Sequence, residues 1–561
     1  MPEIIPAGRL ILLQDLLIDN TYENTIWFSD PITQAQYFES KCPDTTNLKF
    51  TDVNYQRVNS NRLKIRGTAS KIMTCNYMMF INEGFPDQYQ GWVYAFITDA
   101  TYINTYCCEI TYEIDVIQTF MFNYTLGTCF VEREHTPTDE IGEHIIDEGL
   151  PVADYEYTEM YESGQQSALP AFTIDDDLYI VLASTFDDQY NDAVGGDYGA
   201  FFSGLVYHIF GTTQAEMQRC KTFVTGASSA GKDGGIVAIF LAPKWAMDYI
   251  VNPTSTNVPM KTHTLAAPQA YQNFGSYTSV KNNKLYTYPY NYMQIYNGNG
   301  NVAEYKFEKF LQSSSSIPSQ SFVLREYFDF SCSPALLCVP SQYEGLGANY
   351  VESISCGPFP QLSWVSDTYK CWVAQNGTST ILNAIGSGLS AAAPSVGQII
   401  DRKKFNNQAG KGDKEQSILA PIVTGGMRIA DVVLKTISQY AHAKKLPDQA
   451  YGNTNASQLL AIQKMLRFQA YRRHARADYA ESIDNYFTMF GYTVNKLEIP
   501  NIKARKEFTY IKVSECTLHN QHIAQAYTDK IKSVYQNGVR FWVNGDHIGH
   551  YEYDNSPLTT P

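Results

Sequence analysis

The stretch TYCCEITYEIDV, from Thr105 to Val116, alternates apolar and polar side chains along most of its length. Alternation with a period of two is typical of a strand that buries one face and exposes the other. The stretch therefore predicts a half-buried antiparallel strand. Cys107 and Cys108, being consecutive, are expected on opposite faces of it.

Similar runs occur elsewhere in residues 1–150, at Leu63–Arg66 and Trp92–Ile97. The chain of 561 residues also contains 41 Tyr and 29 Phe, which favour strands over helices. We expect a mainly β (α+β) protein, with a β-barrel or sandwich in residues 1–150. Residues 151–376 keep short apolar strands such as Ile236–Leu241 but lose the rhythm, and this block predicts a second β-rich region with long loops.

One stretch of the middle block resembles a phosphate-binding loop. Gly226 to Lys232 fits that pattern, but Asp233 stands where a Ser or Thr hydroxyl would ligate magnesium. A carboxylate at that position would also repel a phosphate. The strand expected at Ile236–Leu241 replaces the helix that such a loop needs. The sequence predicts a Gly/Ser turn here and no nucleotide site.

The pattern changes again after residue 447. Leu459, Ile462, Leu466, Ala470 and Tyr471 recur at helical spacing, and they predict one long helix over residues 456–490, ended by Gly491. Its basic residues fit a solvated, salt-bridged face or, alternatively, contacts to phosphate: Lys464, Arg467, Arg472, Arg473 and Arg476. Strands are expected again at Thr493–Val494, Phe508–Val513 and Arg540–Val543.

The most unusual stretch runs from Lys370 to Ala443, and we expect an apolar insert there with bounds at 377–446. No charged residue occurs from Cys371 to Ile400, a charged patch spans Asp401–Glu415, and a second uncharged arm spans Gln416–Met427. This order predicts a hairpin-like insert with a charged turn. Basic side chains in the turn would resist crossing a bilayer or would bind anionic headgroups.

The first arm is long enough to span a bilayer, although Ser, Gly and Asn dilute it and Pro394 interrupts it. Small residues at four-residue spacing favour close helix contacts in lipid. The residues expected to plug a lumen or to contact lipid are Ile381, Leu382, Ile385, Gly386, Gly388, Leu389, Ala392, Val396, Ile399, Ile400, Ile418, Leu419, Ile422 and Val423. A plain Gly/Ala/Ser loop and an oligomer contact remain as alternatives, and the second arm could insert or act as a hinge.

The sequence gives little support for a metal site or for catalysis. His519 and His522, like His547 and His550, have metal-compatible spacing but no Cys or H-E-x-x-H partner, so structural histidines are expected and no metal or cofactor. The cluster Glu132–His135 with Asp147 and Glu148 could be read as acid/base chemistry, yet carboxylates are frequent in this acidic chain.

Charge and cysteine content narrow the class further. A net charge of −15 disfavours a surface built to hold DNA phosphates, although a tube that lets DNA slip past would also need that sign. Eleven cysteines without a C-x-x-C pair predict no disulfide framework and synthesis in a reducing cytoplasm. The apolar N-terminus carries Glu3, Asp15 and Asp19 and is not expected to be a signal peptide.

Several ordered blocks resemble a known family. They are Asn24–Phe28, Trp92–Asn123, Arg133–His135 with Ile146–Leu150, Tyr471–Arg473, Gly491–Lys512 and Asn537–Trp542. In this order they are similar to the tail knob, or distal tail tube, proteins of small short-tailed bacteriophages of Gram-positive hosts.

The resemblance implies a homo-hexameric tube in the virion. Residues 1–150 and 447–561 would form its β-barrel-like wall, 151–376 a knob, and 377–446 a plug that enters the host membrane. It also implies contact with an upper tail or collar protein, and DNA passing the lumen without specific binding. The charged turn Asp401–Glu415 departs from the family's loop. A receptor-binding protein that grips wall carbohydrate is the first alternative, and a wall-degrading enzyme the second.

Overall fold

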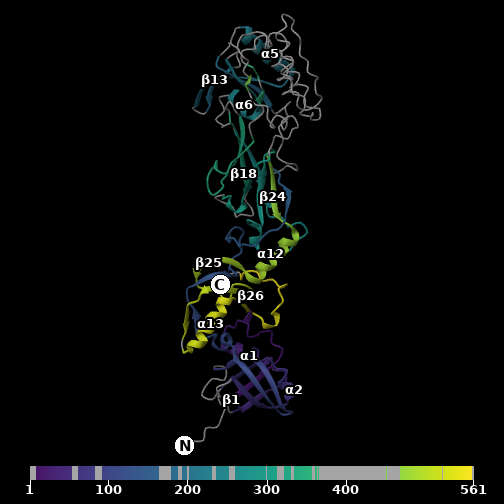
Figure 1. Cartoon of the computed structure of the whole chain (residues 1–561), viewed down its shortest axis with the longest axis vertical. Coiled ribbons are helices and arrows are strands. Elements are labelled where there is room, and N and C mark those ends of the chain that lie inside the picture. The colour runs from purple at the N-terminus through teal and green to yellow at the C-terminus, as the bar shows by residue number, and fades with distance from the viewer. Residues whose placement is uncertain are drawn as a thin grey trace. The chain divides into compact units, whose positions relative to one another are not determined.

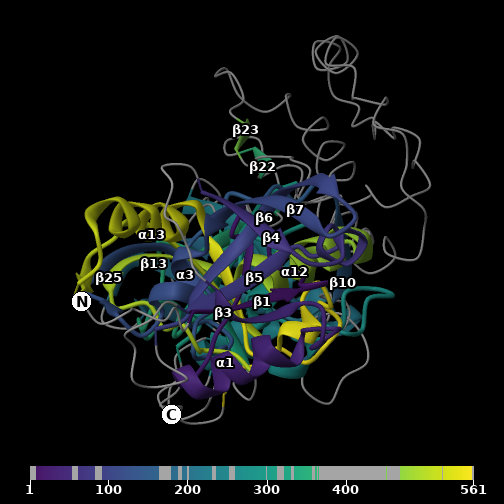
Figure 2. The same cartoon turned by 90° about the horizontal axis from the view of Figure 1, so that it is seen from below.

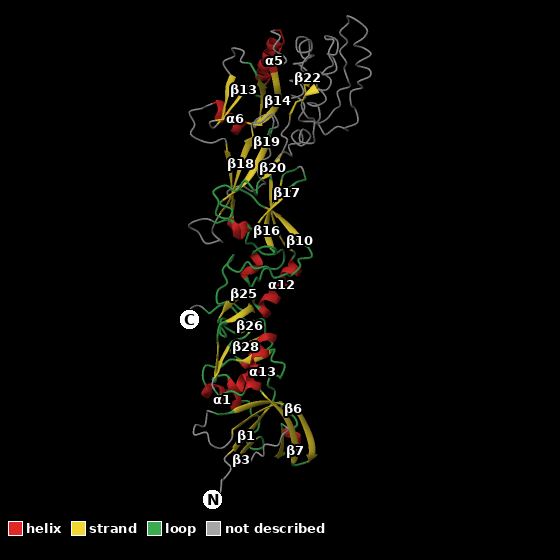
Figure 3. Cartoon of the chain, turned by 60° about the vertical axis from the view of Figure 1, so that its left-hand side comes forward, coloured by secondary structure: helices red, strands yellow, loops and turns green. Residues whose placement is uncertain are grey.

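The computed structural model describes residues 8–53, 61–81, 91–162, 178–186, 193–198, 201–229, 235–251, 260–298, 300–311, 321–329, 334–356, 361–362, 364–365, 450–451, 468–520 and 522–558. Strands dominate these residues, so the prediction of a mainly β protein is confirmed (Figure 3). The chain forms two compact units. Unit 1 comprises residues 1–154, 273–285 and 476–561, and unit 2 comprises 155–272 and 286–475.

Unit 1 contains a six-stranded antiparallel sheet in the order β3-β1-β5-β6-β7-β4 (Figure 2). Its strands are β1 (Gly8–Leu13), β3 (Lys49–Val53), β4 (Arg62–Arg66), β5 (Tyr77–Ile81), β6 (Val93–Asn104) and β7 (Cys107–Ile114). Central strand β1 buries both faces, because Leu10 and Leu12 pack into one cluster and Ile11 and Leu13 into another. Cys107 is half-buried and Cys108 fully buried, which confirms their opposite orientation. The closure of this block into a barrel stays a prediction.

A second sheet of unit 1, here called the shared sheet, combines strands from both ends of the sequence. Its order is β2-β28-β26-β9-β25, with β2 (Asn24–Ile26), β9 (Cys129–Glu134), β25 (Tyr492–Glu498), β26 (Phe508–Glu515) and β28 (Val539–Trp542). N-terminal β9 lies between C-terminal β25 and β26, so neither end of the chain completes this sheet alone. The small ladder of β8 (Tyr124–Leu126) with β27 (Leu518–Asn520) also joins the two ends.

In unit 1, capping residues mark the start of α1 and the end of α12. In α1 (Pro31–Ser40), the Asp30 side chain accepts a hydrogen bond from the Thr33 amide at 2.8 Å, and Pro31 occupies the first turn. In α12 (Ala477–Phe490), buried residues follow helical spacing, and the helix ends at Gly491 with φ of 63°. The other helices are α2 (Ala69–Ile72), α3 (Val116–Phe120), α13 (Gln525–Asn537) and the short 3-10 turn η6 (Gly545–His547).

A segment from the middle of the chain, residues 273–285, belongs to unit 1 because α12 holds it. The buried Asp484 carboxylate accepts hydrogen bonds from the Tyr277 hydroxyl at 2.6 Å, the Lys281 amide at 2.7 Å and the Asn282 amide at 3.0 Å. A buried carboxylate without such donors would be costly. No pattern in the sequence had indicated this contact.

Unit 2 contains three antiparallel sheets (Figure 1). The first has β12 (Ala193–Tyr198), β13 (Phe201–Phe210), β11 (Leu178–Ser184), β14 (Ile236–Pro243) and β21 (Gln361–Leu362). The second has β15 (Met260–Ala266), β18 (Ser321–Asp329), β19 (Ala335–Ser341) and β20 (Ile354–Cys356). The third has β10 (Tyr155–Glu159), β24 (Gln469–Ala475), β16 (Asn291–Tyr296) and β17 (Val302–Tyr305). Helices α5 (Gln214–Ser229) and α6 (Lys244–Val251) and the 3-10 turns η2 (Ala267–Gln269) and η4 (Phe307–Lys309) also belong to unit 2. The 3-10 turn η3 (Asn283–Tyr286) starts in the 273–285 segment of unit 1 and ends at the first residue of the next part of unit 2.

Two expectations from the sequence are wrong. The prediction of one long helix over 456–490 is wrong for residues 469–475, which form strand β24; the helix α12 begins only at Ala477. Arg472 and His474 are buried at the two-residue spacing of a strand. Because both are polar, the apolar pattern of the sequence does not reveal this spacing. The turn expected at Gly226–Asp233 is also wrong in its described part, because residues 226–229 form the last turn of α5. The strand predicted after it is confirmed as β14.

Candidate functional site

The site with the clearest functional meaning is the base of the predicted insert. All the predicted plug residues, from Ile381 to Val423, lie outside the described residues, as do residues 366–449 as a whole. What the structure describes is the chain on both sides. We call these strands the neck: β21, β22 (Trp364–Val365) and β23 (Ala450–Tyr451).

The two ends of the insert meet at the neck. Strand β22 pairs with β23 in antiparallel orientation, with Trp364 opposite Tyr451 and Val365 opposite Ala450 (Figure 2). Opposite residues in such a pair lie about 5 Å apart. Residues 366–449 therefore leave and rejoin the structure at one place, as the hairpin-like prediction requires.

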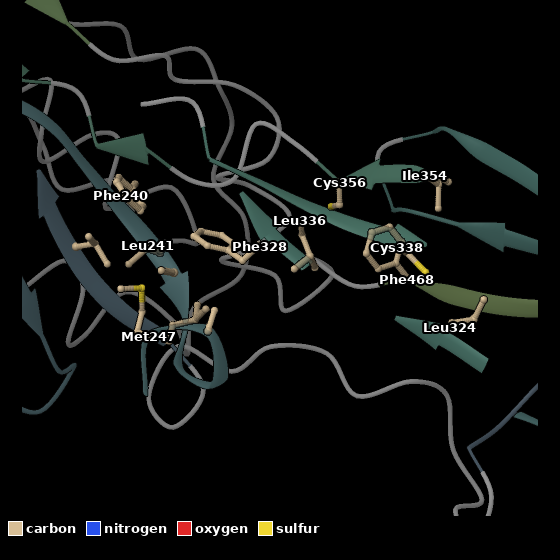
Figure 4. Close-up of a cluster of buried hydrophobic side chains, with 14 of the residues drawn as sticks. Phe240, Leu241, Met247, Leu324, Phe328, Leu336, Cys338, Ile354, Cys356 and Phe468 are labelled. Carbon is tan, nitrogen blue, oxygen red and sulfur yellow. The ribbon is translucent and has the colours of Figure 1, made fainter. Parts of the chain in front are cut away.

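The neck is connected to a well-packed core. On the entering side, β21 pairs with β14, with Leu362 opposite Ile239 and Gln361 opposite Phe240. Phe240 is fully buried, and its ring lies 6.4 Å from that of Phe328 (Figure 4). On the returning side, Phe468 is also fully buried in the same cluster, directly before β24. The described residues on both sides of the insert thus lead into the buried core of unit 2.

A histidine with two carboxylate partners lies in the same unit. His263 on β15 contacts Glu162, and its Nε2 lies 3.1 Å from Oε2 of Glu326 on β18. Burial disfavours the imidazolium, but the two carboxylates outweigh that cost, and the pKa of His263 rises above its ordinary value. The two carboxylates therefore favour the protonated form of His263, which pairs across β15 and β18 with Glu326.

The acid/base cluster that the sequence offered has structural partners. The buried Glu148 carboxylate contacts Arg133 and Lys284 and accepts a hydrogen bond from the Thr493 amide at 2.9 Å. Burial opposes ionisation of Glu148, but Lys284 and Arg133 outweigh it and lower its pKa. This carboxylate ties β9, β25 and the 273–285 segment together.

His135 is equally constrained. Its Nε2 lies 3.1 Å from the Thr488 carbonyl, and its Nδ1 accepts from the Tyr510 amide at 2.8 Å. Burial, with Arg505 nearby, lowers the pKa of His135 to about 3, so the ring is neutral near pH 7. Burial, with Glu498 adding to it, raises the pKa of the neighbouring Glu134 carboxyl to about 8. These groups organise the shared sheet.

Two of the four histidines with metal-compatible spacing have carboxylate partners. His547 Nδ1 lies 2.7 Å from Glu507 and His550 Nδ1 lies 2.7 Å from Glu552, while His519 and His522 lie on either side of a residue outside the described set. Among the described residues, no group of three or more His, Cys, Asp or Glu is arranged to hold a metal. Within that same part of the chain, no helix is long and apolar enough to cross a membrane.

Two family models of phage tail proteins match this chain. The profile of the C-terminal domain of the Bacillus phage phi29 tail knob protein gp9 matches residues 255–556, and that of the caudoviral major tail protein N-terminus matches residues 7–125. Tail knob protein gp9 of Bacillus phage PZA is 23% identical over 97% of this chain and 98% of its own length. The protein of the same name from Bacillus phage phi29 is 22% identical over the same shares.

One solved structure has the same fold over nearly the whole chain. The tail knob protein gp12 of bacteriophage C1 superimposes with a TM-score of 0.59, covering 98% of this chain and 100% of that chain. The two sequences are only 11% identical. The similarity therefore concerns the fold alone.

Proposed function

Since the chain belongs to the family of the Bacillus phage tail knob protein gp9, we propose that it conducts the phage genome through a tube at the end of the tail. It is a structural tail component of a short-tailed phage and not an enzyme, and its place is in the virion with other tail proteins. The tube, the hexamer, the contact with a collar protein and the membrane step belong to the proposal.

The wall of the tube comes from the two ends of the chain. The observation that supports this is the shared sheet, in which β9 is inserted between β25 and β26. Glu148, Arg133 and Lys284 reinforce it with buried charge pairs. Six copies would enclose a lumen, and the net charge of −15 would let DNA pass without binding it.

The insert at 377–446 is the plug and, after release, the part that contacts the host cytoplasmic membrane. Two observations support this role. The neck joins the two sides of residues 366–449 at one place next to a buried core, so release of the insert would not require its holder to unfold. Its first arm has no charge from Cys371 to Ile400, as lipid contact requires.

Release of dye from liposomes tests this function. We expect the full-length protein to release dye under mildly acidic or low-detergent conditions. Replacing Gly377–Lys444 by a short polar linker should abolish that release. Unchanged leakage in this variant, with the protein still folded and assembled, would overturn the membrane role.

A matched pair of variants sharpens the test. Ile385→Glu with Leu389→Glu places two charges in the apolar arm, each costing about 3 kcal/mol at a bilayer centre, so leakage should fall at least about tenfold. Asn406→Glu with Asn407→Glu adds the same charge within the charged turn and should leave leakage nearly unchanged. Equal losses in both would indicate a general charge effect and contradict the assignment.

A second function, binding of wall carbohydrate, is favoured by one surface of unit 2. The solvent-facing side of β10, β24 and β16 carries Tyr157 with 54% exposure, and Arg473 lies 4.1 Å over the ring of Tyr155. Aromatic rings beside charged groups can stack on sugars and bond their hydroxyls. Tyr157→Ala should weaken binding of the full-length protein to purified host wall, and unchanged binding would remove this candidate.

A further inference from the structure

Two cysteines from opposite ends of the sequence face each other where the shared sheet meets the β8–β27 ladder. In the β9–β26 pairing, Phe130 lies opposite Glu515. Cys129 is the next residue of β9, and Cys516 directly follows the last residue of β26, so continuing the antiparallel pairing by one step places the two cysteines next to each other. Beyond them, the separate β8–β27 ladder pairs Leu126 with Leu518, in a register shifted by one residue. Backbone pairing on both sides fixes their positions.

The Cys129 thiol points toward this neighbour. The Thr517 amide donates to Cys129 Sγ at 3.3 Å, and the Gly127 amide donates to the Thr517 carbonyl at 2.8 Å. Since the Thr517 nitrogen is bonded directly to Cys516, the Cys129 sulfur lies beside the backbone of Cys516. Cys129 is 1% exposed, whereas Cys516 is half-buried and packs on the same core cluster.

Directly opposite positions in an antiparallel pair suit a disulfide. Their Cα atoms lie about 4.5–5.5 Å apart, and disulfides occur at Cα separations of about 4.4–6.8 Å. Closing the bond therefore needs side-chain rotation and little backbone movement. Both residues are free thiols in this structure.

We propose that Cys129 and Cys516 form an oxidation site, at which small organic disulfides close an intramolecular cross-link after the virion leaves the reducing cytoplasm. The sequence predicts free thiols because the protein is made in a reducing cytoplasm, and the same surroundings apply while the virion is assembled inside the host. A released virion meets oxidising surroundings instead. The cross-link covalently joins the N-terminal and C-terminal strands of the shared sheet.

The chemistry balances with one small disulfide as oxidant. The more exposed Cys516, as thiolate, attacks the small disulfide, forms a mixed disulfide and releases one small thiol. The Cys129 thiolate then attacks Cys516 Sγ, forms the protein disulfide and releases the second small thiol. The two cysteine protons leave on the two small thiols.

Burial sets the rate of this reaction. Burial, with Cys129 adding to it, raises the pKa of the Cys516 thiol to about 12. The thiolate fraction at neutral pH is therefore small and grows about tenfold per pH unit. Cross-linking should be slow during assembly and faster as the pH rises.

The test uses the full-length protein incubated with oxidised glutathione or with the smaller, neutral bis(2-hydroxyethyl) disulfide. Remaining thiols are alkylated in denaturant, and peptides are mapped by mass spectrometry. Alkylation of Cys129 and Cys516 should fall at least tenfold together, with a linked peptide appearing. In a non-reducing gel the oxidised chain should migrate faster, because the bond closes a loop over most of the sequence.

Variants separate this pair from the other cysteines. Cys516→Ser should abolish both the linked peptide and the faster migration. Cys42→Ser is the matched control, because Cys42 is also half-buried and packs on a cluster that contains buried Cys75; this variant should still oxidise fully. The proposal is overturned if Cys129 and Cys516 stay fully alkylated with both oxidants, or if Cys516→Ser keeps the faster migration.

Discussion

The shared sheet in unit 1 and the neck in unit 2 represent opposite ways of fixing a chain. The shared sheet pairs five strands from distant parts of the sequence and buries Val131, Ile511 and Trp542 completely. The neck holds the ends of a long insert through strands of two residues each. Because local opening costs less where fewer contacts must break, the neck should open far more readily than the shared sheet.

The largest expected effect comes from the buried charge pairs of the shared sheet. Glu148→Gln leaves Arg133 and Lys284 without their carboxylate while both side chains stay largely buried. We expect a loss of about 3–5 kcal/mol in the free energy of unfolding, measured by denaturant titration.

The control for that variant is Glu132→Gln, on β9 beside Arg133. Its pair with Lys512 is 2.8 Å long, but the side chains are 36% and 40% exposed. We expect less than about 1 kcal/mol there. Equal losses in the two variants would mean that burial does not govern these pairs.

A smaller loss is expected at the glycine that ends α12. Gly491 has φ of 63°, and a Cβ there would lie 2.2 Å from the Glu134 carbonyl oxygen. Gly491→Ala should cost about 2–3 kcal/mol of stability, since it adds a clash with β9 to a strained backbone. Gly549→Ala has φ of 91° but open space around it, and it should cost only about 1 kcal/mol. Thermal unfolding of the two variants separates the clash from the backbone term.

The third expectation concerns pH and unit 2. The folded-state pKa of His263 lies above its unfolded value of about 6.5, since Glu326 and Glu162 outweigh the cost of burial. Its stabilising contribution is therefore complete below about pH 6.5 and is lost as the pH rises through the folded-state pKa. The slope is at most about 1.4 kcal/mol per pH unit. In His263→Gln this component should disappear from the pH profile of unit 2 unfolding, and an unchanged profile would contradict the assignment.

The smallest global effect is expected at the neck itself. Replacing Ala450 and Tyr451 by proline removes both N–H groups that β23 can donate to β22. The free energy of unfolding should fall by only about 1 kcal/mol, while amide exchange at Trp364 and Val365 should accelerate strongly. A large global loss would show that the neck is part of the cooperative core, and the contrast with the shared sheet would fail.

Local patterns carried the strand predictions well. The alternation in Thr105–Val116 corresponds to β7, whose first residues alternate between half-buried and buried. Phe508–Val513 corresponds to β26, whose first four residues are all buried, so its aromatic and β-branched residues and not an alternation indicated it. The sequence analysis predicts no helix in residues 151–376, where the structure has α5 and α6. The signal for α5 was present, because four of its apolar residues recur at helical spacing and are buried: Cys220, Phe223, Val224 and Ala227.

The errors arose where burial and polarity disagree. Ala470 and Tyr471 continue an apolar pattern that favours a helix over residues 469–475. The structure buries Ala470, Arg472 and His474 in alternation instead, so two polar residues occupy the buried face of a strand. Arg472 is accommodated by Asn291 Oδ1 at 2.7 Å and the Gln272 carbonyl at 2.9 Å. Such partners come from distant segments, and a single stretch of sequence does not contain them.

The sequence by itself determined the mainly β class, the family and the uncharged arm of the insert, since all three depend on the order and type of neighbouring residues. Only the tertiary structure decided which strands share a sheet, why Glu148 and Asp484 are buried, and that Cys129 faces Cys516. These features depend on contacts between residues hundreds of positions apart. Their energies come from burial and pairing, which local periodicity does not record.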